Sequence, residues 1–187
     1  MRLENRQPER RWWPESVRTF RRDARAATVV EFALVIAPLI ALLLAILETS
    51  LVYFSQEGLE TTAEAAGRLV MTGQAQSAGW SASQFQTQVC NTLPPYMSCS
   101  QLMIDVQSSS SFSNANIGMP TITYNSNNGA VSNAWQYNVG AAGAIVVVRL
   151  MYIWPVLTGP LGFSLANTSN GRRVLMATSV TKTEPYS

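Results

Sequence analysis

The sequence predicts an α+β protein in which a long N-terminal helix crosses a membrane and then packs on a small antiparallel β-sheet. Three observations carry this prediction. An uncharged apolar run of 16 residues extends from Phe32 to Leu47. Apolar residues at helical spacing continue beyond it, and the second half of the chain holds short apolar or alternating segments separated by turn-forming residues.

The membrane anchor is predicted over residues 26–50. A bilayer core of about 30 Å needs ~20 helical residues, and counting from Ala26 to Leu47 gives 22. Residues 1–25 hold eight arginines against four acids, which predicts a cytoplasmic N-terminus and a single pass through a bacterial inner membrane. No small-x-small pattern follows the apolar core, so a retained anchor is favoured over a cleaved secretory signal. The basic residues that flank the span are Arg18, Arg21, Arg22 and Arg25.

The helix is predicted to continue as an amphipathic segment over residues 51–76, so that one helix runs from about 28 to 72. Five apolar residues follow one another at spacings of seven, four, three and four, which places them on one helical face. They are Val52, Leu59, Ala63, Ala66 and Val70. Gly73 is the predicted C-terminal stop.

Residues 77–187 are predicted to form a periplasmic α+β domain. A short helix is expected between Ser77 and Gln88, capped at Ser81 or Ser83. Residues 144–154 are apolar on both faces, which indicates a central strand. Alternation predicts further strands at residues 102–107 and 172–184. The Ser-, Asn- and Gly-rich stretches in 108–140 are expected to be surface loops, with a short strand between them at 121–124.

The chain has two cysteines, Cys90 and Cys99, and no histidine. In an oxidising periplasm a disulfide between them is favoured over two free thiols. This composition argues against a tetrahedral zinc site, and no nucleophile–base pair or phosphate loop is visible. We therefore expect a protein that is not an enzyme and has no cofactor or metal. The basic excess directly precedes the apolar run, which favours a membrane flank over nucleic-acid binding.

Glu31 is a feature of the anchor that its composition does not explain, whereas Glu48, at the other edge, is expected to be interfacial. A carboxylate inside a membrane span is costly and usually marks pairing or function. The plainer alternative is that Glu31, near the cytoplasmic edge, reaches the headgroups with the help of Arg25.

The order of these features resembles a known family. The stretch "RAATVVEFALVIAPLIALLLAILETSLVYFSQEGLETTAEAAGRLV", together with the C-terminal "LMATSVTKTEPYS", is similar to the TadE-like proteins, minor pseudopilins of the tight-adherence (Flp, type IVb pilus) system. The resemblance covers residues 25–72 and 144–187. It implies a pilin-like fold and a membrane-anchored subunit that supports assembly or initiation of an adhesive pilus.

The resemblance also assigns roles to residues. In prepilin-like subunits a prepilin peptidase cuts after a small residue, usually Gly, so that Glu becomes position five; here that bond is Ala26–Ala27. If it is cut, Glu31, beside Phe32, can pair with the free amine of Ala27 in a neighbouring subunit. If it is not cut, Arg22 or Arg25 is the candidate partner.

The partners implied by the resemblance are other pilin and pseudopilin subunits and the pilus assembly platform in the inner membrane. No nucleic acid is expected. The alternative function is a membrane-tethered periplasmic binding module unrelated to pili, whose binding surface would be the loops at 108–140.

Overall fold

The computed structural model describes residues 24–125, 130–156, 159, 162–168 and 170–185. The chain divides into two compact units, Met1–Ala45 and Ile46–Ser187. The described elements, in chain order, are α2, α3, α4, η1, β1, η2, β2 and β3. The chain has the α+β class that the sequence predicts, with a long apolar N-terminal helix and a three-stranded antiparallel sheet.

The long helix α2 spans Ala24–Met71, and it continues through Pro38. It ends where the sequence predicts, because Gly73 has φ 72°. Only glycine adopts this left-handed conformation without a steric penalty, which is why it so often closes a helix. The four-residue helix α3 (Gln74–Ser77) follows immediately.

From Val29 to Phe54, in the first unit and at the start of the second, α2 exposes most of its apolar side chains. Most large hydrophobic residues that are exposed in the described chain lie on this helix, between Val29 and Phe54. An isolated helix with such a surface would not remain in water, since soluble proteins rarely expose contiguous apolar patches of this kind. The exposure therefore indicates a surrounding that is itself apolar.

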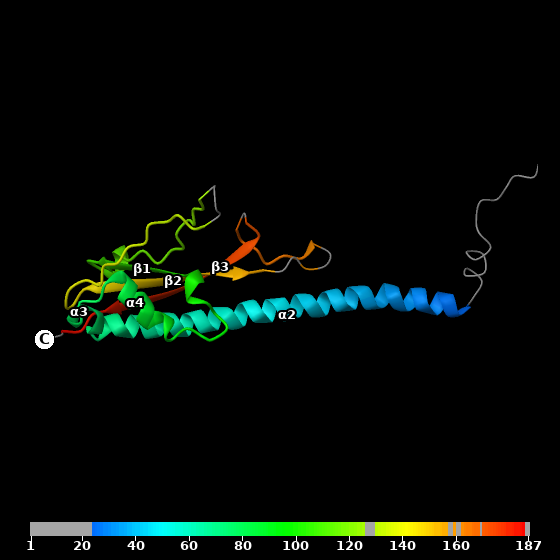
Figure 1. The fold of residues 1–187 in the computed structure, drawn as a ribbon, viewed down its shortest axis with the longest axis horizontal. Helices are drawn as coiled ribbons and strands as arrows, with labels where there is room; N and C mark the ends of the chain where they lie inside the picture. The colour runs from blue at the N-terminus through cyan, green and yellow to red at the C-terminus, as the bar shows by residue number, and fades with distance from the viewer. Residues whose placement is uncertain (1–23, 126–129, 157–158, 160–161, 169, 186–187) are drawn as a thin grey trace, which may run out of the picture. The chain divides into compact units, whose positions relative to one another are not determined.

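Within the second unit, three strands form an antiparallel sheet in the order β1–β2–β3 (Figure 1). Their bounds are Leu102–Ser109 for β1, Ile145–Pro155 for β2 and Arg172–Lys182 for β3. β2 is the central strand, as its apolar faces predict, and its first nine residues are all buried. The short 3₁₀ helices η1 (Cys99–Gln101) and η2 (Phe112–Asn114) lie on either side of β1 in the sequence.

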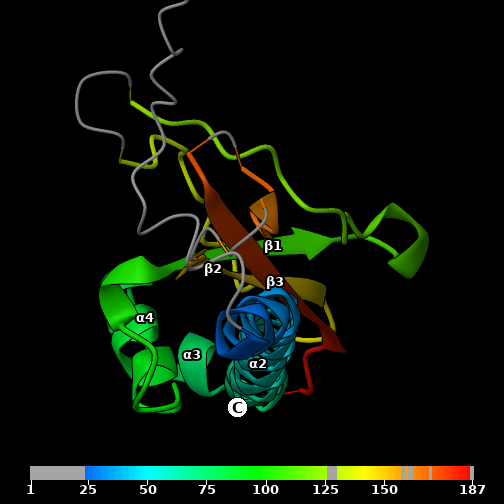
Figure 2. The ribbon, with the colours of Figure 1, turned by 90° about the vertical axis from the view of Figure 1, so that its right-hand side faces the viewer.

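One face of the sheet packs on the second half of α2. The five residues predicted to share a helical face are all buried there, and they meet Val148 and Leu150 of β2 and Leu175 of β3 in one core. Figure 2 shows β3 crossing over α2, with α3 and α4 beside the same helix. α4 (Ala82–Cys90) begins with a capping box at Ser81 and contributes Phe85 to this core.

The other face of the sheet is covered by the connection between β1 and β2. Ile122, Tyr124 and Trp135 pack there against Met151 and its neighbours in a second core, which we call the outer-face cluster. The strand predicted at 121–124 is wrong, because only an isolated bridge joins Tyr124 to Val131. Ile122 and Tyr124 of this segment pack on the outer face of the sheet. The backbone of the segment does not add a fourth strand to the sheet.

Candidate membrane and assembly site

Glu31 and Phe32 lie early in α2, and both side chains are exposed. They sit in the apolar surface that begins at Val29. Among the residues whose side chains are described, none forms an ion pair or hydrogen bond with the Glu31 carboxylate. The predicted flanking residues Arg18, Arg21 and Arg22 lie outside the described residues, as do the side chains of Arg25, Ala26 and Ala27.

Length and composition make α2 compatible with a single-pass membrane anchor. In the described part of the chain it is the one helix long and apolar enough to cross a bilayer, with a mean hydropathy of 2.8 in its most apolar window. No side chain in that window is buried. A hydrophobic core helix of a soluble domain would instead be covered by protein.

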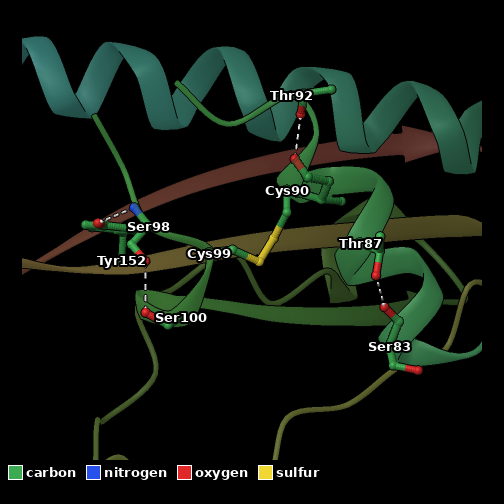
Figure 3. Close-up of a disulfide and its surroundings, with 9 residues drawn as sticks. Ser83, Thr87, Cys90, Thr92, Ser98, Cys99, Ser100 and Tyr152 are labelled. Atoms are coloured by element: carbon green, nitrogen blue, oxygen red, sulfur yellow. Dashed lines mark hydrogen bonds between the residues drawn. A yellow bond between two sulfur atoms is a disulfide. The ribbon is translucent and has the colours of Figure 1, made fainter. Parts of the chain in front are cut away.

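The disulfide between Cys90 and Cys99 is present in the structure, with 5.6 Å between the Cα atoms (Figure 3). It joins the last residue of α4 to the first residue of η1, which leads directly into β1. The loop it closes is also held at its far end, because the Ser98 N–H donates to the Tyr152 hydroxyl at 2.9 Å. The disulfide therefore fixes the loop, residues 91–98, against the sheet.

This loop carries an aromatic residue back to α2. Tyr96 stacks on Phe54 with 5.0 Å between ring centroids, and its hydroxyl donates to the Phe54 carbonyl at 3.3 Å. Gly58 makes room, because a Cβ there would lie 2.6 Å from the tyrosine oxygen. Partial burial raises the pKa of the Tyr96 phenol.

A buried ion pair that the sequence reasoning missed lies on the outer face of the sheet. Asp105 and Arg149 are register partners on β1 and β2, and Arg149 Nε donates to Asp105 Oδ2 at 3.0 Å. The pair also holds the covering connection, since Asp105 accepts the Gln136 N–H at 2.8 Å and Arg149 donates to the Gly118 carbonyl at 3.1 Å. The sequence did carry a signal of this pair, because the strand predicted at 102–107 contains one acidic residue and the strand predicted at 144–154 contains one basic residue.

Two further observations bear on the binding of metal ions and small molecules. Among the described residues, no group of three His, Cys, Asp or Glu side chains is placed to hold a metal ion. An open cavity of about 390 Å³ lies between the outer-face connection and the start of β3, lined in part by Met119, Tyr124 and Thr168. None of the described residues that line it carries a charged side chain.

The fold and this site define a class of protein: one apolar N-terminal helix, compatible with a single-pass membrane anchor, that continues into a small disulfide-containing α+β domain. Residues 26–68 match the model of the family described as TadE-like protein. The match confirms the resemblance seen in the sequence over this segment and is consistent with a TadE-like protein of the Tad/Flp pilus system. The family is a structural, pilus-related one. Neither curated proteins nor solved structures give a match to the chain.

Proposed function

We propose that this chain is a minor pseudopilin-like subunit that is anchored in the bacterial inner membrane and supports assembly or initiation of an adhesive type IVb (Flp/Tad) pilus. One observation carries the proposal. The TadE-like match, residues 26–68, falls within α2 and covers both its lipid-compatible part and its sheet-packed part. The proposed working element is therefore the helix itself, with the α+β unit attached to its far half.

Glu31 is the proposed contact point between subunits. A carboxylate in an apolar, exposed helical surface is expensive unless a cation neutralises it, and the described side chains of this chain supply none. A cation from a neighbouring subunit would satisfy Glu31 and fix the axial register of two helices, with Phe32 packing beside it. This mode of pairing gives an assembly signal that works only inside the membrane.

The source of that cation is set by processing at Ala26–Ala27. Cleavage would supply the free amine of Ala27, and an intact chain would supply Arg22 or Arg25. Intact-mass measurement of the protein isolated from membranes separates the two, because cleavage removes residues 1–26. A cleaved chain would make the amine of Ala27 the candidate partner, and an intact chain would leave Arg22 and Arg25 as the candidates.

The proposed topology places the N-terminus in the cytoplasm and the α+β unit in the periplasm. The arginine-rich N-terminal segment supports this orientation. The Cys90–Cys99 disulfide fits the same assignment, because disulfides persist in the oxidising periplasm and are rare in the cytoplasm.

A membrane-tethered binding module is the second candidate, and the cavity between the outer-face connection and β3 is the observation that favours it. Release distinguishes the two functions. Pili are sheared from cells that express the tagged full-length chain, and the sheared fraction and the detergent-solubilised membranes are both probed for it. A pseudopilin-like subunit co-purifies with sheared pili or with assembly-platform proteins. A tethered module stays in the membrane fraction with neither.

A further inference from the structure

The apolar surface of α2 is longer than a bilayer core. Its exposed large hydrophobic residues run from Val29 to Phe54, which is 26 residues, whereas the core takes about 20. The anchor predicted over residues 26–50 ends at Ser50. Tyr53 and Phe54, which are 69% and 60% exposed, then fall in the next turn, about 4–6 Å beyond its end at 1.5 Å per residue. This is the depth of the headgroup layer.

The surface of α2 changes abruptly after Phe54. From there on, its exposed side chains are polar or charged, as at Glu57, Glu60 and Glu64. The next large exposed hydrophobic residue in the chain is Tyr96, and it stacks on Phe54 through the contacts described above. Two segments separated by 42 residues therefore meet at one level of the helix. Aromatic residues with a polar tip concentrate at such a level because their rings prefer the boundary between acyl chains and water.

The β2–β3 connection lies at the same end of the second unit. Gln56 of α2 donates to the Met176 carbonyl of β3, and the Glu184 N–H donates to the Met71 carbonyl. β3 thus runs along α2 in the same direction, so Arg172, at its start, lies at the Ile46 end. Figure 1 shows the described residues of this connection, in orange, at the end of the sheet away from α3.

That connection carries groups suited to a lipid surface. Phe163 is an exposed hydrophobic residue within it, and Arg172 is exposed beside it. Anionic headgroups attract a guanidinium near a membrane surface, and a phenylalanine ring can enter the boundary between headgroups and acyl chains. The Ile46 end of the second unit thus carries exposed aromatic rings and an exposed arginine.

We propose that these residues form a membrane-contacting collar, defined as Tyr53, Phe54, Tyr96, Phe163 and Arg172, whose partner is the periplasmic lipid surface. The collar seats the α+β unit directly on the bilayer and sets how far α2 emerges from it. The proposal rests on membrane anchorage by α2 but not on a role in pili. It commits to lipid because Tyr53 and Phe54 lie on the same helix as the exposed apolar residues of the span, and Tyr96 stacks on Phe54.

The test uses the full-length chain in proteoliposomes that contain phosphatidylglycerol. The two native cysteines are joined in the disulfide, so a single introduced cysteine takes a spin label specifically. Labels are placed at Tyr53→Cys, Tyr96→Cys and Phe163→Cys. Leu43→Cys is the control for lipid, and Glu64→Cys, exposed and ten residues beyond Phe54 on α2, is the control for water. Collision rates with oxygen and with a water-soluble nickel complex report the depth of each label.

The collar predicts that all three test labels collide with the nickel complex several-fold less than the Glu64→Cys label. Their oxygen collision rates should lie between those of the two controls.

Test labels as accessible to the nickel complex as the Glu64→Cys label, with the Leu43→Cys label still in lipid, would overturn the collar while leaving the anchor intact. Label–label broadening at Tyr96→Cys would also overturn it, because a second copy would then be the partner. A water-exposed Leu43→Cys label would remove anchorage itself and the collar with it. Tyr53→Cys keeps the test valid if Tyr96→Cys disturbs the loop, since Tyr53 makes no ring contact among the described residues.

Discussion

Arg149 and Asp105 face each other across the β1–β2 ladder and form an ion pair that is buried on both sides. The pair links the sheet to the connection that covers it, through Gln136 on one side and Gly118 on the other. A buried charge pair of this kind adds little net stability compared with apolar residues, but each charge depends on the other. Its consequence here is to hold Gly118 and Gln136 of the covering connection against the sheet.

Asp105→Asn should therefore destabilise the fold strongly, by about 3–5 kcal/mol, because it leaves the Arg149 guanidinium buried without a counter-charge. Urea unfolding of the full chain in detergent micelles, followed by tryptophan fluorescence, measures the loss. The matched control is Asp105→Leu with Arg149→Met, which removes both charges and should cost less than the single change. A double variant as unstable as Asp105→Asn would contradict the explanation.

Gly67 sets the distance between α2 and β3. A Cβ at this position would lie 2.2 Å from Ser179 Oγ, so Gly67→Ala must push the helix from the strand. Overpacking costs about 1–3 kcal/mol, which exceeds the gain of up to ~1 kcal/mol in helix propensity. We expect a lower unfolding midpoint, with partial recovery when Ser179→Ala is added.

Gly118→Ala is the matched control for this change. A Cβ there meets only Asn116 at 3.5 Å, an ordinary contact, so its midpoint should stay close to that of the unchanged chain. If Gly67→Ala and Gly118→Ala behave alike, the close approach of α2 to β3 does not limit stability.

The disulfide should stabilise the second unit chiefly by restricting its unfolded state. Cys90 and Cys99 are nine positions apart, and closing so short a loop contributes about 2–3 kcal/mol. Replacing both cysteines with alanine should lower the unfolding free energy by that amount and increase proteolysis in the loop that holds Tyr96. Unreduced native protein should contain no thiol that reacts with iodoacetamide, and two reactive thiols would argue against both the bridge and a periplasmic location.

The parts of this molecule that local patterns determine were predictable from the sequence. The helical face that begins at Val52 is buried, β2 is central because both its faces are apolar, and Ser81 caps α4 with its own side chain. In each case, one continuous stretch of sequence is enough to predict the feature.

What could not be predicted depends on residues far apart in the chain. The Asp105–Arg149 pair joins positions 44 apart, and its formation requires the strand register, which no local pattern gives. The segment 121–124 alternates like a strand, yet alternation alone does not reveal whether its backbone joins a ladder or crosses a sheet face. The stacking of Tyr96 on Phe54 likewise depends on where the disulfide places the loop.

The assembly role of Glu31 is the central claim, and counting pili on cells tests it most directly. A strain that lacks this chain is complemented with the unchanged protein, with Glu31→Ala, or with Glu48→Ala as a control on the same helix. Electron microscopy gives the number of pili per cell, and immunoblots of membranes confirm equal amounts of the three proteins. The account predicts that the unchanged chain and Glu48→Ala restore piliation, whereas Glu31→Ala inserts normally but restores few or no pili. Full piliation with Glu31→Ala, or in the strain that lacks the chain, would contradict it.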